Sequence, residues 1–65
     1  MTDQDKSNYL WDGGWLINYD GWWHPPHCLA SWPLDEAYKM ALREEAKGLR
    51  MSAEEVADYI KGVNQ

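Results

Sequence analysis

The residue types that could carry chemistry gather in one short stretch, HPPHC from His24 to Cys28, with Asp20 just before it. Two imidazoles, a thiol and a carboxylate are good ligands for zinc. Structural zinc sites usually take their ligands from two separated segments, whereas here two prolines stiffen a single loop. We therefore predict no bound metal and no cofactor. The stretch is interpreted as a rigid loop with His24 and His27 at the surface and Cys28 packed against a tryptophan.

The same side chains could be drawn as a nucleophile and its base, Cys28 with His27 or His24. Such a pair also needs a third group to orient the base and a site for the oxyanion. A chain of 65 residues has little room for a ligand pocket of about 300 Å³ or more. We expect no enzymatic activity.

Charge limits the partners that the chain could bind. The net charge is −5, and the six basic residues are interleaved with eleven acidic ones. Direct binding to nucleic acid or to an anionic membrane needs clustered lysine and arginine, so neither is expected. A lone cysteine excludes a disulfide within the chain and fits a reducing compartment. With no leader-like segment and no apolar run of membrane-spanning length, we predict a cytoplasmic protein with no membrane partner.

The elements that would position these residues fall into two unlike halves of a single domain, residues 1–65. Residues 1–8 are polar and are expected to be disordered. Residues 9–24 hold most of the tryptophans and two turn signals, Asp12-Gly13-Gly14 and Asp20-Gly21. Glycine supplies the positive φ angles of tight hairpins, so this segment predicts a three-stranded antiparallel meander.

The second half has the spacing of helices. Apolar residues recur every three to four positions over residues 34–49, which predicts a first helix ending near Gly48. Ser52 and Glu55 form a capping-box pattern that predicts a second helix over residues 52–62. The predicted fold class is α+β: a small, Trp-rich, three-stranded meander followed by a two-helix hairpin.

Large apolar side chains exceed what so small a fold can bury. Trp22 and Trp23 are neighbours in a predicted strand and must point to opposite faces, while the helices cover only one face. Some tryptophan is therefore expected at the surface, where exposed aromatic patches mark binding sites. The predicted partner-binding residues are Trp11, Trp22, Trp23, Tyr38, Leu42, Val56, Tyr59 and Ile60.

The predicted helical hairpin resembles the interaction segment of the Sin family of bacterial regulators. The matching residues are Leu42, Glu45-Ala46-Lys47, Met51-Ser52, Glu54-Glu55-Val56 and Tyr59-Ile60. In that family two short helices of an antirepressor interlock with the equivalent helices of a repressor and break up its DNA-binding oligomer. The resemblance implies a protein partner and an amphipathic docking surface made by both helices.

Together these observations predict a small acidic regulator that sequesters or remodels a partner protein. A transcription factor is the partner that the resemblance implies, and a phage or plasmid is a suitable source for such a regulator. The exposed apolar residues of the two helices could also pack against a second copy of the chain, so a homodimer is possible. Two alternatives stay open: a nucleic-acid-binding accessory protein, and a small zinc-binding structural module built on His24, His27 and Cys28.

Overall fold

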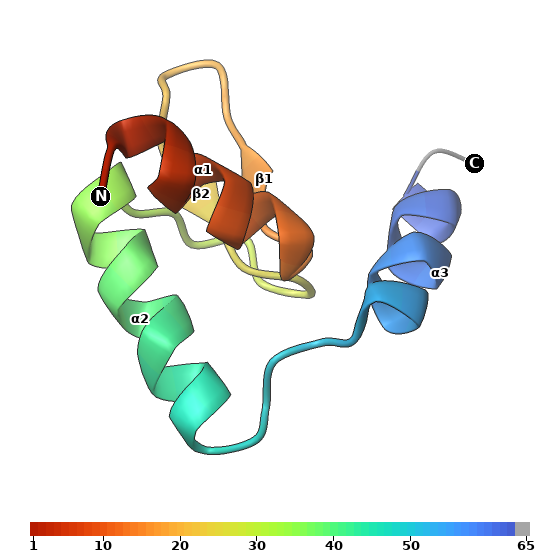
Figure 1. The fold of residues 1–65 in the computed structure, drawn as a ribbon. Coiled ribbons are helices and arrows are strands. Elements are labelled where there is room, and N and C mark those ends of the chain that lie inside the picture. The colour runs from red at the N-terminus through yellow and green to blue at the C-terminus, as the bar shows by residue number, and fades with distance from the viewer. Residues whose placement is uncertain (64–65) are drawn as a thin grey trace.

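The computed structural model describes residues 1–63. Over that range the chain has three α-helices and one two-stranded sheet, in the order α1 (Asp3–Asp12), β1 (Leu16–Ile17), β2 (Trp23–His24), α2 (Leu34–Ala46) and α3 (Ala53–Val63). α1 packs against α2, whereas α3 stands to one side at the end of an extended linker (Figure 1). The α+β class stands, but the predicted three-stranded meander followed by a helical hairpin is wrong.

The N-terminal segment is helical because its first residues form a capping box. The Thr2 hydroxyl accepts a hydrogen bond from the Asp5 backbone N–H (3.2 Å), and the Asp5 carboxylate accepts one from the Thr2 N–H (3.1 Å). Acidic side chains in the first turn also suit the helix dipole. The prediction that residues 1–8 are disordered is therefore wrong, and residues 9–11 belong to α1 instead of a first strand.

The two glycines after Asp12 end this helix and do not form a hairpin turn. Gly14 has φ 90°, and its backbone N–H donates to the Trp11 carbonyl. The Trp15 N–H donates to the Leu10 carbonyl over 3.0 Å. Together these bonds satisfy the last carbonyls of α1 in a Schellman-type end, which favours glycine at the left-handed position.

The core lies between α1, α2 and the hairpin. Leu10 on α1 is completely buried, and it belongs to one cluster with Trp15, Trp23, Ala37 and Ala41. The two alanines are four residues apart on α2, so they present one small-residue face that lets α1 approach closely. Two tryptophans thus supply much of the apolar volume that a chain of this size would otherwise lack.

The β-hairpin is shorter than predicted. Its strands are antiparallel, with Leu16 opposite His24 and Ile17 opposite Trp23. The chain does turn at Asp20-Gly21, but the turn is wider than a two-residue hairpin turn: it runs from Asn18 to Gly21, where the Gly21 N–H donates to the Asn18 carbonyl and Gly21 has φ 85°. On its other side β2 forms an isolated bridge to Trp32, through two backbone hydrogen bonds of 2.8 Å.

The two predicted helices are present as α2 and α3, but they do not form a hairpin. α2 ends at Ala46, two residues before Gly48, which has φ 74°, and α3 begins with the predicted capping box between Ser52 and Glu55. In the part of the chain that the structure describes, α3 does not pack along α2. The linker leads away from α2 because its Arg50 is bound to Tyr9 of α1.

Candidate functional site

A groove lies between the end of α1 and the first two turns of α3, and we call it the α1–α3 groove. Its volume is about 410 Å³. Trp11 forms one wall and is 49% exposed, while Val56 of α3 forms the floor and is buried. Alanines one turn apart on α3 leave the space open above Val56. The complete lining is Trp11, Asp12, Ala53, Val56 and Ala57.

The groove owes its width to the way in which α3 is attached. A Cβ atom on Gly14 would lie 3.2 Å from the Met51 Sδ and 3.6 Å from a methyl group of Val56, so only glycine lets α3 approach this closely. The Tyr59 hydroxyl accepts a hydrogen bond from the His27 backbone N–H over 3.3 Å. The rings of these two residues meet edge to face, with centroids 4.6 Å apart.

The other wall, α1, is fixed by a stacked guanidinium. The Cζ of Arg50 lies 3.7 Å from the ring centroid of Tyr9, and its Nη2 donates to the Tyr9 carbonyl over 2.8 Å. The Tyr9 hydroxyl donates to the Glu45 carboxylate. Burial, and then this hydrogen bond, raise the pKa of Tyr9 above its ordinary value. The linker, α1 and α2 therefore meet at one tyrosine.

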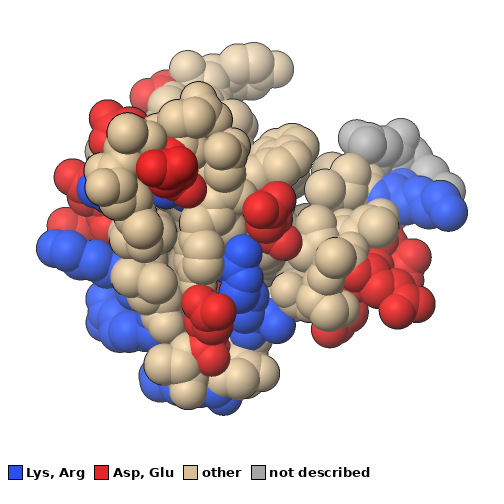
Figure 2. All heavy atoms as spheres, viewed as in Figure 1, with Lys and Arg blue, Asp and Glu red and all other residues tan. Residues whose placement is uncertain are grey.

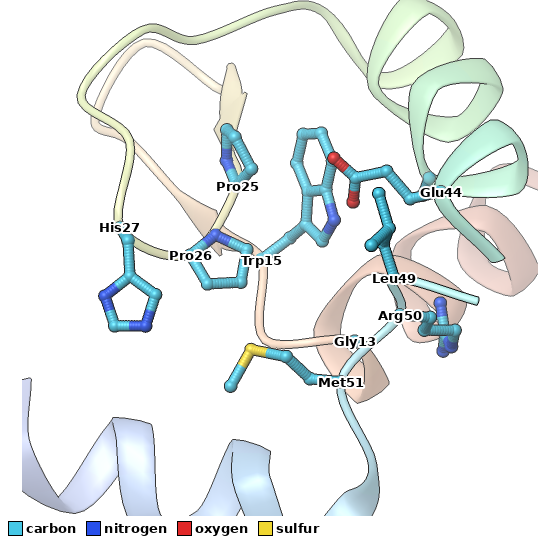
Figure 3. A pocket seen from close by; sticks show the side chains of 10 residues that line it. Gly13, Trp15, Pro25, Pro26, His27, Glu44, Leu49, Arg50 and Met51 are labelled. Carbon is cyan, nitrogen blue, oxygen red and sulfur yellow. The ribbon is translucent and has the colours of Figure 1, made fainter. Parts of the chain in front are cut away.

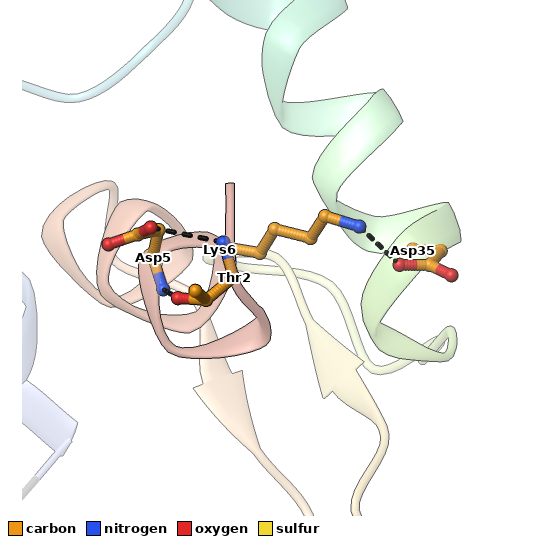
Figure 4. A network of polar contacts seen from close by, with 4 residues as sticks. All are labelled: Thr2, Asp5, Lys6 and Asp35. Atoms are coloured by element: carbon orange, nitrogen blue, oxygen red, sulfur yellow. Dashed lines mark hydrogen bonds and ion pairs between the residues drawn. The ribbon is translucent and has the colours of Figure 1, made fainter.

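A second set of contacts joins the start of α1 to α2. The ring of Tyr38 lies edge-on to Tyr9, with centroids 5.4 Å apart. The Lys6 ammonium lies 5.8 Å from the Tyr38 centroid and pairs with Asp35 over 2.8 Å (Figure 4). The hydrogen bond from Lys6 lowers the pKa of Asp35 and raises the pKa of Lys6 itself. Tyr38 is thus engaged within the molecule.

The HPPHC stretch holds the loop and α3 in place. The His24 Nδ1 lies 3.2 Å from the Cys28 carbonyl oxygen and 3.3 Å from that of Pro25. Both oxygens are acceptors, so Nδ1 carries the proton. His27 has φ 63° and contacts Tyr59, while Cys28 is half-buried. Among residues 1–63, no three His, Cys, Asp or Glu side chains are grouped so as to hold a metal ion.

The structure places the eight predicted partner-binding residues on several surfaces. Trp11 and Val56 meet in the α1–α3 groove, and Ile60 is half-buried one turn beyond Val56. Leu42 is exposed on α2, away from the α3 residues, because the two helices do not pack together. The remaining four are the hairpin residues Trp22 (exposed) and Trp23 (buried), and the internally engaged Tyr38 and Tyr59.

Sequence reasoning missed three residues of the groove, Asp12, Ala53 and Ala57. The two alanines stand at helical spacing with Val56, which is a signal that a search restricted to large apolar residues overlooks. The sequence predicts Asp12 in a hairpin turn, and its place at the groove depends on α1 being a helix.

No protein-family profile, curated protein sequence or solved structure matches this chain. Of the helices within residues 1–63, none combines the length and the apolar character needed to cross a bilayer. A proposal for the function must therefore be based on the geometry and the charge of the described residues.

Proposed function

We propose that this protein is a small acidic regulator that grips a basic, amphipathic helix of a partner protein in the α1–α3 groove. One observation carries the proposal: Trp11, about half exposed, stands beside an apolar groove floored by Val56. Tryptophan is the residue most enriched among binding hot spots, especially beside a desolvated pocket. An exposed indole at such a place supports recognition of a protein surface.

The walls of the groove suit a helical occupant. Both walls are helices, and the groove offers an apolar floor bounded by small residues. An amphipathic helix can lay an apolar side chain into such a groove, the mode used by many helix-binding proteins. Ala53 and Ala57 allow the backbone of the occupant to come close, because neither has a side chain beyond Cβ.

Charge favours a basic occupant. Asp12 lines the groove itself, and Glu54 is one residue from Ala53 on α3. In Figure 2 acidic atoms gather over α3, while basic atoms gather over the lower part of α2. Complementary charge speeds the encounter and selects the partner. The two groove helices carry two lysines, Lys6 and Lys61, against six acids: Asp3, Asp5, Asp12, Glu54, Glu55 and Asp58.

Sequestration of a transcription factor is the consequence that we propose. Proteins that bind DNA present lysine and arginine on helices that meet the phosphates. A groove that holds such a helix against acidic side chains would keep it from DNA. This regulator would act as an antirepressor through the α1–α3 groove, and not through an interlocking hairpin, because α2 and α3 do not pack together.

A designed peptide tests this proposal. The probe is an amphipathic peptide about 18 residues long, five helical turns, with leucine on one face and lysine on the other. Calorimetry should show binding, and Trp11→Ala should weaken it about thirtyfold, as expected for a hot spot of about 2 kcal/mol. The matched control is Trp22→Ala, because Trp22 is 45% exposed, close to the 49% of Trp11, but lies in the hairpin.

A peptide with glutamate in place of every lysine should fail to bind. Equal losses from Trp11→Ala and Trp22→Ala would show that the groove is not the binding site. Equal binding of the lysine and glutamate peptides would remove the argument from charge.

A further inference from the structure

A second hollow lies on the other side of Gly14, and we call it the Trp15 pocket. Its volume is about 190 Å³. A water molecule takes about 30 Å³ of liquid, and pockets for drug-sized ligands start near 300 Å³. The pocket therefore has room for one amino-acid side chain and is too small for a cofactor.

The lining of the Trp15 pocket combines apolar walls with one carboxylate. The residues come from the end of α1, the HPPHC loop, α2 and the linker (Figure 3). Glu44 is half-buried at the pocket and, within residues 1–63, pairs with no lysine or arginine within 4 Å. The apolar walls are made by Trp15, Pro25, Pro26, Leu49 and Met51.

Lysine and arginine side chains match this lining. Each has an aliphatic stem that packs on apolar surface and a charged head that seeks a carboxylate. An acidic or neutral side chain would leave Glu44 repelled or unpaired.

Arg50 also lines the pocket, yet it does not make the pocket an anion site. Its guanidinium stacks on Tyr9, and its Nη2 donates to the Tyr9 carbonyl. Its Nη1 is buried, with no hydrogen-bond partner among the described residues, and lies 2.9 Å from where a Gly13 Cβ would be. The stacking and the hydrogen bond hold the guanidinium against Tyr9 of α1, and Glu44 supplies the carboxylate of the lining.

The Trp15 pocket and the α1–α3 groove adjoin. Gly13 lines the pocket, and the preceding Asp12 lines the groove. Met51 of the pocket and Val56 of the groove both lie against the Gly14 position. We propose that the Trp15 pocket binds one lysine or arginine side chain of the partner whose helix occupies the groove. This inference rests on the proposed function and names the chemistry of the partner residue beside the groove.

Small cations that mimic the side chain test the pocket directly. Titration with n-butylammonium and n-butylguanidinium, followed by ¹H–¹⁵N NMR, should shift the Trp15 indole N–H saturably. It should do the same to the amide of Ala41, which also lines the pocket. Neutral n-butanol should not. Glu44→Gln should weaken the binding about tenfold or more, the usual loss when a hydrogen bond to a charged group is removed. The matched control is Glu36→Gln, an exposed residue of the same helix outside the pocket.

The outcomes separate this inference from the proposed function. Shifts spread over the acids of α3, or equal effects of Glu36→Gln and Glu44→Gln, would overturn the pocket. The pocket would also be overturned if binding of the lysine peptide depended on Trp11 but was unchanged in the Glu44→Gln variant. In that case the proposed function would stand. If the butyl cations bind through Glu44 but the peptide does not bind, the pocket is supported and the groove proposal fails. The wild-type shift map needs no variant, so a misfolded Glu44→Gln would not spoil the test.

Discussion

Trp22 and Trp23 are adjacent in the chain and have opposite surroundings. Trp23 is 6% exposed and lies in the core, whereas Trp22 is 45% exposed. Alternation along a strand predicts that two neighbours part in this way, but it does not say which one points inward. Which of the two points inward depends on the length of the connection between the strands. Ile17 pairs with Trp23, so five residues separate the strands instead of the two of a tight turn.

The first prediction at this scale compares these two residues. Trp23→Ala should remove about 3–5 kcal/mol, a large part of the roughly 3–10 kcal/mol that a chain of this size has, and should abolish folding. Trp22→Ala should leave the melting temperature nearly unchanged. Thermal unfolding followed by circular dichroism measures both. Should the two variants melt together well below the parent, Trp22 would be structural as well.

At the scale of elements, the two helices in the second half of the chain could be predicted from the sequence. Helical spacing and the Ser52–Glu55 box indicate α2 and α3, because each signal is local. The relative placement of the two helices could not be predicted. It depends on Arg50 reaching Tyr9, a contact between residues 41 positions apart.

α1 escaped prediction for a different reason. Its large apolar residues, Tyr9, Leu10 and Trp11, are consecutive, so no helical period is visible, and such residues favour strands. The local signal was the Thr2-x-x-Asp5 capping box. Because the α1–α3 groove needs α1 to be a helix, missing this box also hid the groove. Trp11 and Val56 were named from the sequence, but not as neighbours.

The α1 contacts give a prediction of pH dependence. The hydrogen bond from the Thr2 backbone lowers the pKa of Asp5, and the bond from Lys6 lowers that of Asp35. A carboxyl whose pKa is lowered by folding stabilises the fold above its unfolded pKa, here about 3.9, and loses that contribution as the pH falls through its folded pKa. NMR titration should therefore show both groups protonating below the ordinary range, and α1 loosening below about pH 4.

Two variants separate these contributions. Lys6→Met should raise the pKa of Asp35 toward its ordinary value and leave that of Asp5 lowered. Thr2→Pro removes both the hydroxyl and the backbone N–H that donates to Asp5, so it should raise the pKa of Asp5 and leave that of Asp35 lowered, at a cost of about 1 kcal/mol for the lost cap. Ordinary titration of both groups in the unmodified protein would contradict the contacts in Figure 4.

At the scale of the whole molecule, the bases are grouped and the acids are spread. Each of the three helices carries three or four acids, whereas three bases one turn apart, Lys39, Arg43 and Lys47, are exposed on α2 and at its C-terminal cap. Arg50 would extend this basic strip in sequence, but it is bound to Tyr9. Three aligned bases are few for a chain of net charge −5 to track phosphates.

The last prediction therefore concerns DNA. Random-sequence duplex DNA should bind more weakly than micromolar at about 150 mM salt, because non-specific affinity follows the number of phosphate contacts. Electrophoretic mobility shifts measure this, with an Arg43→Ala variant as the comparison. A submicromolar dissociation constant that Arg43→Ala weakens would favour the nucleic-acid-binding alternative.

The unequal depths of the tryptophans have a spectroscopic consequence. Indole emission moves to longer wavelength in water, so Trp11 and Trp22 dominate the red side of the spectrum, and the buried Trp15 and Trp23 dominate the blue side. Asp12 beside Trp11 and Asp20 beside Trp22 draw caesium ions toward both exposed indoles and repel iodide. A partner seated in the groove covers Trp11 and leaves Trp22 exposed, so its binding is visible as a partial loss of quenching by caesium.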